Sequence, residues 1–259
     1  MGVIWAIATT TMGEAVRRRV LLIILLVALG FLVIAPGLAV LQPRETRSVL
    51  IAMGLGIIQL CSALIAIVLV IYIIPTEIER RTIYTILCKP VQRWQFIVGK
   101  FMGTMLSLFV MMTLMGASFM LVFWQQTGKF DTSVLTGIGL YFVQVSLLAA
   151  VAMMFSTFVS PLVNFFLSAG VYMVGNLLNP FFQTVGESGS VTASTRVIAT
   201  LVHYIFPNFA NYNIQNPIIN PEQVITNATL YMQQITIYGF TYIGILLIVA
   251  ILIFDRREM

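Results

Sequence analysis

The charged side chains that could do chemistry in this chain are concentrated between residues 77 and 100, in the stretch EIERRTIYTILCKPVQRWQFIVGK. Two acids, Glu77 and Glu79, come first, and the basic residues of the stretch are Arg80, Arg81, Lys89, Arg93 and Lys100. Carboxylates and guanidinium groups form ion pairs and charge-assisted hydrogen bonds with another protein. We therefore interpret residues 76–95 as a docking segment for a soluble partner. The alternative is an ordinary charged loop between two membrane spans.

The spacing within this segment predicts a short amphipathic helix. Thr76 is a helix-capping residue type, and Glu77 and Glu79 fall in the first turn, where acids complement the helix dipole. Glu77 and Arg81 are four residues apart, a favourable order for an ion pair. An apolar stripe and a terminating proline complete the pattern, formed by Ile83, Ile86, Leu87 and Pro90.

The rest of the chain has no pattern typical of catalysis or metal binding. His203 is the only histidine, which excludes a multi-histidine metal site within one subunit. The phosphate-binding pattern G-x-x-x-x-G-K-[ST] does not occur, and Gly99-Lys100 enters an apolar run without a glycine-rich loop before it. We expect no catalytic residue, no metal ion and no cofactor bound by this chain.

Composition places the docking segment in a membrane protein. Hydrophobic residues make up 59% of the chain and charged residues 9%, whereas soluble domains carry about 25% charge. Several apolar runs reach the roughly 20 residues that span a bilayer as a helix. They do not alternate with polar residues as the strands of a membrane β-barrel do. We predict an all-α, polytopic membrane protein with one transmembrane domain over residues 1–259 and no nucleic-acid partner.

Six apolar runs are predicted to span the membrane. Their approximate bounds are Val20–Leu41, Val49–Ile74, Phe96–Trp124, Ser133–Phe158, Leu162–Leu178 and Ile235–Phe254. Ser160-Pro161 predicts a tight turn between the fourth and fifth spans. Residues 179–234 form the longest stretch between spans, an extracytoplasmic region that includes His203. Its apolar piece, residues 197–206, is too short to span, so we expect it to lie in the interface or to re-enter the membrane.

Residues 1–19 are expected to form an interfacial helix before an uncleaved first span, because apolar residues recur at helical spacing and Trp5 suits the headgroup layer. A signal peptide and a basic flank that only sets orientation are the alternatives. The predicted membrane-interface anchors are Trp5, Arg17, Arg18, Arg19, Trp94 and Lys100.

Counting Lys and Arg on each side of the six predicted spans orients the chain. Ten fall on one side: Arg17, Arg18, Arg19, Arg80, Arg81, Lys89, Arg93, Lys100, Arg256 and Arg257. Four fall on the other: Arg44, Arg47, Lys129 and Arg196. Basic residues accumulate on the cytoplasmic side. Both termini and the docking segment are therefore predicted to be cytoplasmic, in the inner (cytoplasmic) membrane of the cell.

The predicted spans contain essentially no charged residues, although ion-coupled transporters usually carry them at membrane depth. The polar residues there are Gln59, Ser62, Gln144, Ser146, Asn164 and Asn176, and we favour interhelical hydrogen bonds over substrate contact for them. Small residues, namely Gly54, Gly56, Gly170 and Gly175, are expected to permit close helix contact. Cys61 and Cys88 are predicted to be reduced and structural.

The docking segment resembles the connection between spans two and three of ABC-2 type transporter permeases. The matching residues are Glu77 or Glu79, Arg81, Thr82, Ile86, Leu87, Pro90, Val91, Arg93, Gly99 and Lys100. Arg81 stands where the family often has Gly before the Thr. Within the family, the chain is most similar to the short permeases grouped with the nitrous-oxide-reductase maturation transporter.

This resemblance implies an exporter in which two six-span subunits pair, as a homodimer or heterodimer. Each subunit would bind a cytoplasmic ATPase subunit, which would hold the ATP and Mg. The coupling residues it implies are Glu77, Glu79, Arg80, Arg81, Thr82, Ile86, Leu87, Pro90 and Arg93. An ion-driven secondary transporter or channel is the alternative. An intramembrane enzyme ranks last, because the single His203 falls outside the spans.

Overall fold

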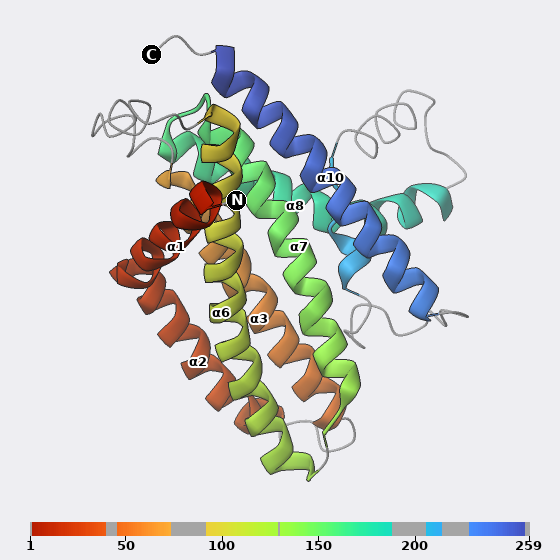
Figure 1. Cartoon of the computed structure of the whole chain (residues 1–259). Coiled ribbons are helices and arrows are strands. Elements are labelled where there is room, and N and C mark those ends of the chain that lie inside the picture. The colour runs from red at the N-terminus through yellow and green to blue at the C-terminus, as the bar shows by residue number, and fades with distance from the viewer. Residues whose placement is uncertain are drawn as a thin grey trace.

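The computed structural model describes residues 2–39, 46–73, 92–128, 130–187, 206–213 and 228–256. Its regular elements are α1 (Gly2–Arg17), α2 (Arg19–Ala39), α3 (Thr46–Ile71), α6 (Arg93–Thr127), α7 (Thr132–Ser156), α8 (Pro161–Glu187), the short 3-10 helix η1 (Ala210–Tyr212) and α10 (Ala228–Arg256). Every predicted span thus corresponds to a helix (Figure 1). The all-helical fold is confirmed for the described part of the chain.

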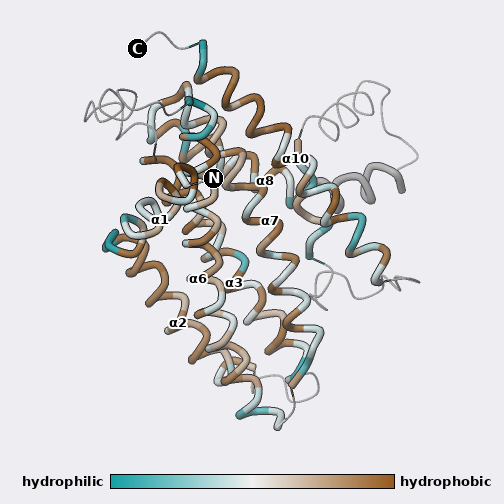
Figure 2. The backbone as a smooth tube through the Cα atoms, viewed as in Figure 1, coloured by the Kyte–Doolittle hydropathy of each residue, from teal (hydrophilic) through white to brown (hydrophobic). Residues whose placement is uncertain are grey.

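Five of these helices are long and apolar enough to cross a membrane: α2, α3, α6, α7 and α10. In α8 the apolar stretch of described side chains, Pro161–Leu177, is shorter than these five. The fifth predicted span, Leu162–Leu178, which falls on this helix, therefore stays a prediction, and so does the total of six spans. Hydrophobic residues follow the lengths of the helices and polar ones gather at helix ends and turns (Figure 2).

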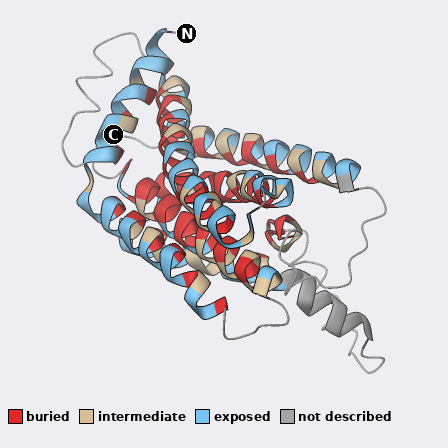
Figure 3. Cartoon of the chain, turned by 90° about the horizontal axis from the view of Figure 1, so that it is seen from below, coloured by how far each residue is buried: buried red, intermediate tan, exposed pale blue. Residues whose placement is uncertain are grey.

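The centre of the bundle is formed by α3 and α7, whose buried residues occupy most of each helix. By contrast, α2 and α10 bury one stripe and expose large apolar side chains such as Leu26, Phe31 and Phe240. Figure 3 shows this arrangement, with buried residues in the middle and exposed ones around the rim. Exposed apolar helix faces of this kind suit contact with lipid, since lipid tails are as apolar as leucine.

Helix α1 lies across the upper part of α6 and crosses the direction of the long helices (Figure 1). Close contact is possible because two α6 glycines face it. A Cβ on Gly103 would lie 2.6 Å from the Ala8 carbonyl oxygen, and one on Gly99 would lie 2.9 Å from Ile7 Cβ. A helix over most of residues 1–19 was predicted, and its position in the membrane interface stays a prediction.

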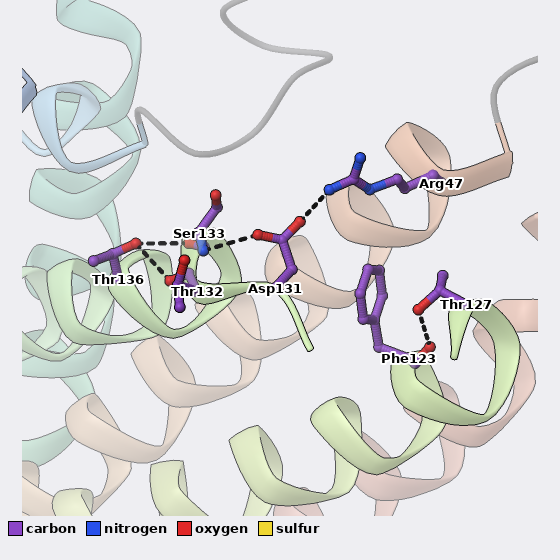
Figure 4. A network of polar contacts seen from close by, with 7 residues as sticks. All are labelled: Arg47, Phe123, Thr127, Asp131, Thr132, Ser133 and Thr136. Atoms are coloured by element: carbon purple, nitrogen blue, oxygen red, sulfur yellow. Dashed lines mark hydrogen bonds and ion pairs between the residues drawn. The ribbon is translucent and has the colours of Figure 1, made fainter. Parts of the chain in front are cut away.

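The ends of α3, α6 and α7 meet at the lower end of the bundle, where an ion pair joins two of them (Figures 1 and 4). Arg47, in the first turn of α3, donates from Nη2 to Asp131 Oδ2 at 2.5 Å. Asp131 also caps α7 by accepting from the Ser133 amide at 3.0 Å. The Arg47 hydrogen bond is the main reason that the pKa of Asp131 is lowered.

We expect Gly103→Ala to destabilise the packing of α1 on α6. The added methyl group meets backbone atoms of α1, which yield less readily than the end of a flexible side chain. Overpacking of this kind costs about 1–3 kcal/mol, so the thermal midpoint in mild detergent should fall. Gly139→Ala is the control, because nothing lies within 4 Å of a Cβ built there. Equal midpoints for the two variants would contradict the proposed contact.

Candidate functional site

The end of the bundle that carries the docking segment is held together by the first turns of α6. Gln92 caps this helix in a capping box with Gln95, whose Oε1 accepts from the Gln92 amide at 3.2 Å. Such reciprocal pairing satisfies amide groups that a helix start leaves without partners. The capping box thereby defines where α6 begins.

Arg93 joins the start of α6 to the end of α10. Its Nη1 donates to the backbone oxygens of Phe254 at 3.2 Å and Asp255 at 2.9 Å, and its Nε lies 3.9 Å from Asp255 Oδ1. The last carbonyls of a helix have no intrahelical donor and attract positive charge. The Phe96 and Phe254 rings of the same two helices stack, with centroids 6.0 Å apart.

Lys100 joins α6 to α1. The residue is buried, and its Nζ lies 3.9 Å from Glu14 Oε2 and 5.7 Å from the centre of the Phe96 ring. A buried ammonium group needs a charged or hydrogen-bonding partner. The contact with Glu14 was not predicted, since nothing in the sequence pairs residues of α1 with residues of α6.

The other predicted interface anchors occupy the surface. Trp5 and Trp94 are exposed, as are Arg17 and Arg19, while Arg18 is half-buried with its guanidinium 5.8 Å from the centre of the Tyr72 ring. Trp94 donates from Nε1 to Gln92 Oε1. These positions agree with an interfacial role, which stays a prediction together with that of Lys100.

Most of the predicted coupling residues lie outside the described residues: Glu77, Glu79, Arg80, Arg81, Thr82, Ile86, Leu87 and Pro90. Cys88 and His203 also lie outside them. Arg93 is the one coupling residue that the structure describes. Its contacts with α10 are a second role that the sequence did not reveal, because a helix end attracts some basic side chain without specifying which one.

A second group of polar residues lies inside the bundle, on α3, α7 and α8. Gln59 donates from Nε2 to Gln144 Oε1 at 3.2 Å and to Asn176 Oδ1 at 3.5 Å. Gln144 donates in turn to Asn176 Oδ1 at 3.2 Å. The three amides therefore form one network, which we call the amide cluster. Gln59 and Gln144 occupy the middle of their helices, which places the cluster near the middle of the bundle.

The amide cluster also holds residues 206–213, a segment that includes the short 3-10 helix η1. Gln144 Nε2 donates to the Phe209 carbonyl at 3.0 Å, and the Phe209 amide donates to the Gly175 carbonyl at 3.1 Å. Gly175 is required there, because a Cβ would lie 2.4 Å from the Phe209 ring. Tyr212 completes the anchoring by donating from its hydroxyl to the Ile235 carbonyl of α10 at 3.1 Å. This described part of the 179–234 region thus enters the bundle.

The prediction of interhelical hydrogen bonds is confirmed for Gln59, Gln144, Asn164 and Asn176. Asn164 Nδ2, on α8, donates to the Ala152 carbonyl of α7 at 3.0 Å. The prediction is wrong for two serines, because their hydroxyl groups donate to carbonyls of their own helix: Ser62 to that of Gln59 and Ser146 to that of Phe142.

Cys61 is buried and forms no disulfide bond with any described residue. Among the described His, Cys, Asp and Glu residues, no group of three or more could hold a metal ion.

Comparison with known sequences shows the family to which the chain belongs. Residues 5–259 match the sequence pattern of the family described as ABC-2 family transporter protein. The chain belongs to this family. A search of curated proteins finds no match.

Members of the ABC-2 transporter family form the membrane component of ABC transporters and are not themselves the ATPase. The chain is accordingly a multi-pass membrane protein of the permease type, in agreement with its apolar helices. The family resemblance drawn from residues 77–100 is confirmed at this level. The closer grouping with the nitrous-oxide-reductase maturation permeases stays a prediction.

We expect Gln144→Leu to loosen the inserted 206–213 segment. The substitution removes one of the two donors to the Phe209 carbonyl, which keeps only the Tyr212 amide, and two bonds within the amide cluster. Each hydrogen bond contributes about 0.5–1.5 kcal/mol to stability. The thermal midpoint in detergent should fall accordingly. Ser146→Ala, one half-turn away, is the control, because that hydroxyl bonds only within α7. A midpoint for Gln144→Leu equal to that of the control would be evidence against this anchoring.

Arg93→Ala should fray the last turn of α10. Charge-assisted hydrogen bonds contribute about 1.5–3 kcal/mol, and the two carbonyls at residues 254 and 255 lose theirs. Amide hydrogen exchange in the peptide covering residues 249–256 should rise several-fold. Arg256→Ala is the matched control, since Arg256 is exposed on the same turn and forms none of the ion pairs found in the described part of the chain. Unchanged amide hydrogen exchange in Arg93→Ala would refute the proposal that Arg93 holds the last turn of α10.

Proposed function

We propose that the chain is the membrane subunit of an ATP-driven exporter of the ABC-2 type, working as a dimer in the inner (cytoplasmic) membrane with both termini in the cytoplasm. A separate cytoplasmic ATPase subunit binds ATP and Mg, and docks on residues 76–95. Family membership supports the transporter class, and the ten-to-four distribution of Lys and Arg supports the orientation.

The observation that carries this proposal is the connection of the docking segment to three helices. The segment ends in Arg93 and Trp94 at the start of α6. Through Arg93 it is tied to α10, and through Lys100, two turns later, to α1. A displacement of the segment by an ATPase would therefore move α1, α6 and α10 together. Packed elements transmit such displacements because close-packed interiors deform little.

The interior of the bundle favours ATP coupling over an ion gradient. Among the described residues, the amide cluster consists of neutral side chains that already bond one another. Ion-driven transporters place titratable residues at membrane depth as a rule. Lys100 is the buried charged residue of the described part, and it lies near the end of α6 beside Glu14.

Purification of the tagged protein from its native host in mild detergent tests the proposal. We expect a stoichiometric cytoplasmic ATPase to co-purify, with vanadate-sensitive hydrolysis. Glu79→Ala combined with Arg81→Ala should lower ATPase recovery at least several-fold, because both side chains are proposed to contact the partner. Arg257→Ala is the control, since it also removes positive charge from the cytoplasmic side but lies outside the docking segment.

Protein level and membrane insertion should stay unchanged in all variants, since the spans are intact. An oligomer free of ATPase that still moves solute along an ion gradient in liposomes would overturn the proposal and establish the ion-driven alternative.

A further inference from the structure

A cavity of about 740 Å³ lies where α2, α3 and α8 come together. Its lining is formed by the first residues of α2, the last turn and a half of α3 and the turn into α8: Arg18, Arg19, Val20, Val68, Ile71, Tyr72, Ser160, Pro161, Leu162 and Phe165. We call it the arginine pocket. It lies apart from the amide cluster and from the contacts of Arg93 and Lys100, and shares no residue with them.

The arginine pocket is apolar below and cationic at one edge. Val68 and Ile71 belong to α3, which packs against both α2 and α8 and so forms the floor between them. Val20 and Leu162 on the two sides are 56% and 69% exposed, so the pocket opens sideways, toward the lipid that surrounds the bundle. Arg18 and Arg19 occupy the position where α2 begins its apolar run, at the level of the lipid headgroups.

No acid in the described part of the chain forms an ion pair with the guanidinium groups of the pocket. The three ion pairs found within the described residues use Arg47, Arg93 and Lys100. Arg18 is instead held over the ring of Tyr72, a lining residue, with 5.8 Å between Cζ and the ring centre. Such stacking fixes a guanidinium without neutralising it. Guanidinium groups bind phosphate bidentately and are weakly hydrated, which suits a partly desolvated site.

We propose that the arginine pocket binds one anionic phospholipid of the leaflet in which α2 begins. Arg18 and Arg19 bind the phosphate and headgroup, and an acyl chain lies between Val20 and Leu162 against the floor of α3. Basic pockets between transmembrane helices on the cytoplasmic side are typical binding sites for such headgroups. The volume falls in the range of pockets that hold small-molecule ligands. The lipid would fill the gap between α2 and α8.

Native mass spectrometry of the full-length protein, purified in mild detergent, tests this site. Phosphatidylglycerol and phosphatidylcholine with identical acyl chains are added at equal concentration, and retained lipid is measured. We expect the wild type to retain phosphatidylglycerol in preference. Each basic residue near a membrane surface contributes about fivefold to the binding of anionic lipid, so Arg18→Gln with Arg19→Gln should lower the preference by about an order of magnitude or more.

Arg17→Gln is the matched control for charge. Arg17 adjoins the pair in sequence and is exposed, but does not line the pocket. An equal loss of preference in this variant would show that only general surface charge acts, and would overturn the proposal. Retention of the preference in the double variant would overturn it as well.

A second pair of variants tests the apolar half of the pocket. Val20→Trp fills the side of the pocket and should reduce phosphatidylglycerol retention, whereas Leu26→Trp places the same side chain on an exposed position of α2 outside the lining. Glycerol phosphate without acyl chains should not compete with the lipid. Full competition, or equal effects of the two tryptophans, would mean that no acyl chain lies in the pocket.

A last pair of variants tests whether the acids of the docking segment pair with the two arginines of the pocket. If Glu77 and Glu79 occupied the two arginines, the wild type would show no preference for phosphatidylglycerol. A preference that arose only after Glu77→Gln and Glu79→Gln would therefore overturn the proposal.

Discussion

Inside a bilayer every amide and carbonyl needs a protein partner, because hydrocarbon offers none and an unpaired group costs several kcal/mol. Long α-helices meet this requirement by themselves, whereas residues 206–213 form only the single turn η1 and rely on further partners. Their insertion among the helices depends on Gln144 and Gly175, which pair the carbonyl and the amide of Phe209. Gln144 is oriented for this task by Gln59 and Asn176. The amide cluster is therefore first of all a support for this segment, and it links α3, α7 and α8 in doing so.

Close packing adds to these hydrogen bonds. Helices in a membrane gain little from hiding apolar surface, since lipid is equally apolar, and association depends on contact between well-fitted surfaces. Glycines supply the fit at several places, three of which involve a ring or a helix backbone. Gly54 leaves room for the Phe119 ring, Gly103 for the backbone of α1 and Gly175 for Phe209. Two of the four glycines predicted to allow close contact, Gly54 and Gly175, thus do so between elements of this one chain.

Among the described residues, ion pairs lie toward the ends of the bundle, where they connect elements distant in sequence. Arg47 and Asp131 join the starts of α3 and α7 at one end. At the other, Arg93 and Lys100 join α6 to α10 and to α1. The second end carries the docking segment, so a partner that moved this segment would act on three helices through two cations. The arginines of the pocket differ from these cations in forming none of the ion pairs found among the described residues.

The sequence by itself determined the fold class, the approximate bounds of the helices and the family. Apolar runs of membrane-spanning length leave the backbone little choice but helix, and residues 77–100 carry the family pattern in local order. It also indicated that Gln59, Gln144, Asn164 and Asn176 join helices, because neutral amides at membrane depth must find partners.

Only the tertiary structure decided which partners these residues find. It pairs Lys100 with Glu14, brings Arg93 to the end of α10, inserts Phe209 beside Gln144 and leaves a pocket under Arg18 and Arg19. Each of these contacts joins residues far apart in the chain. Their meeting depends on how helices cross and how closely glycines let them approach, and periodicity along one helix carries no information about either.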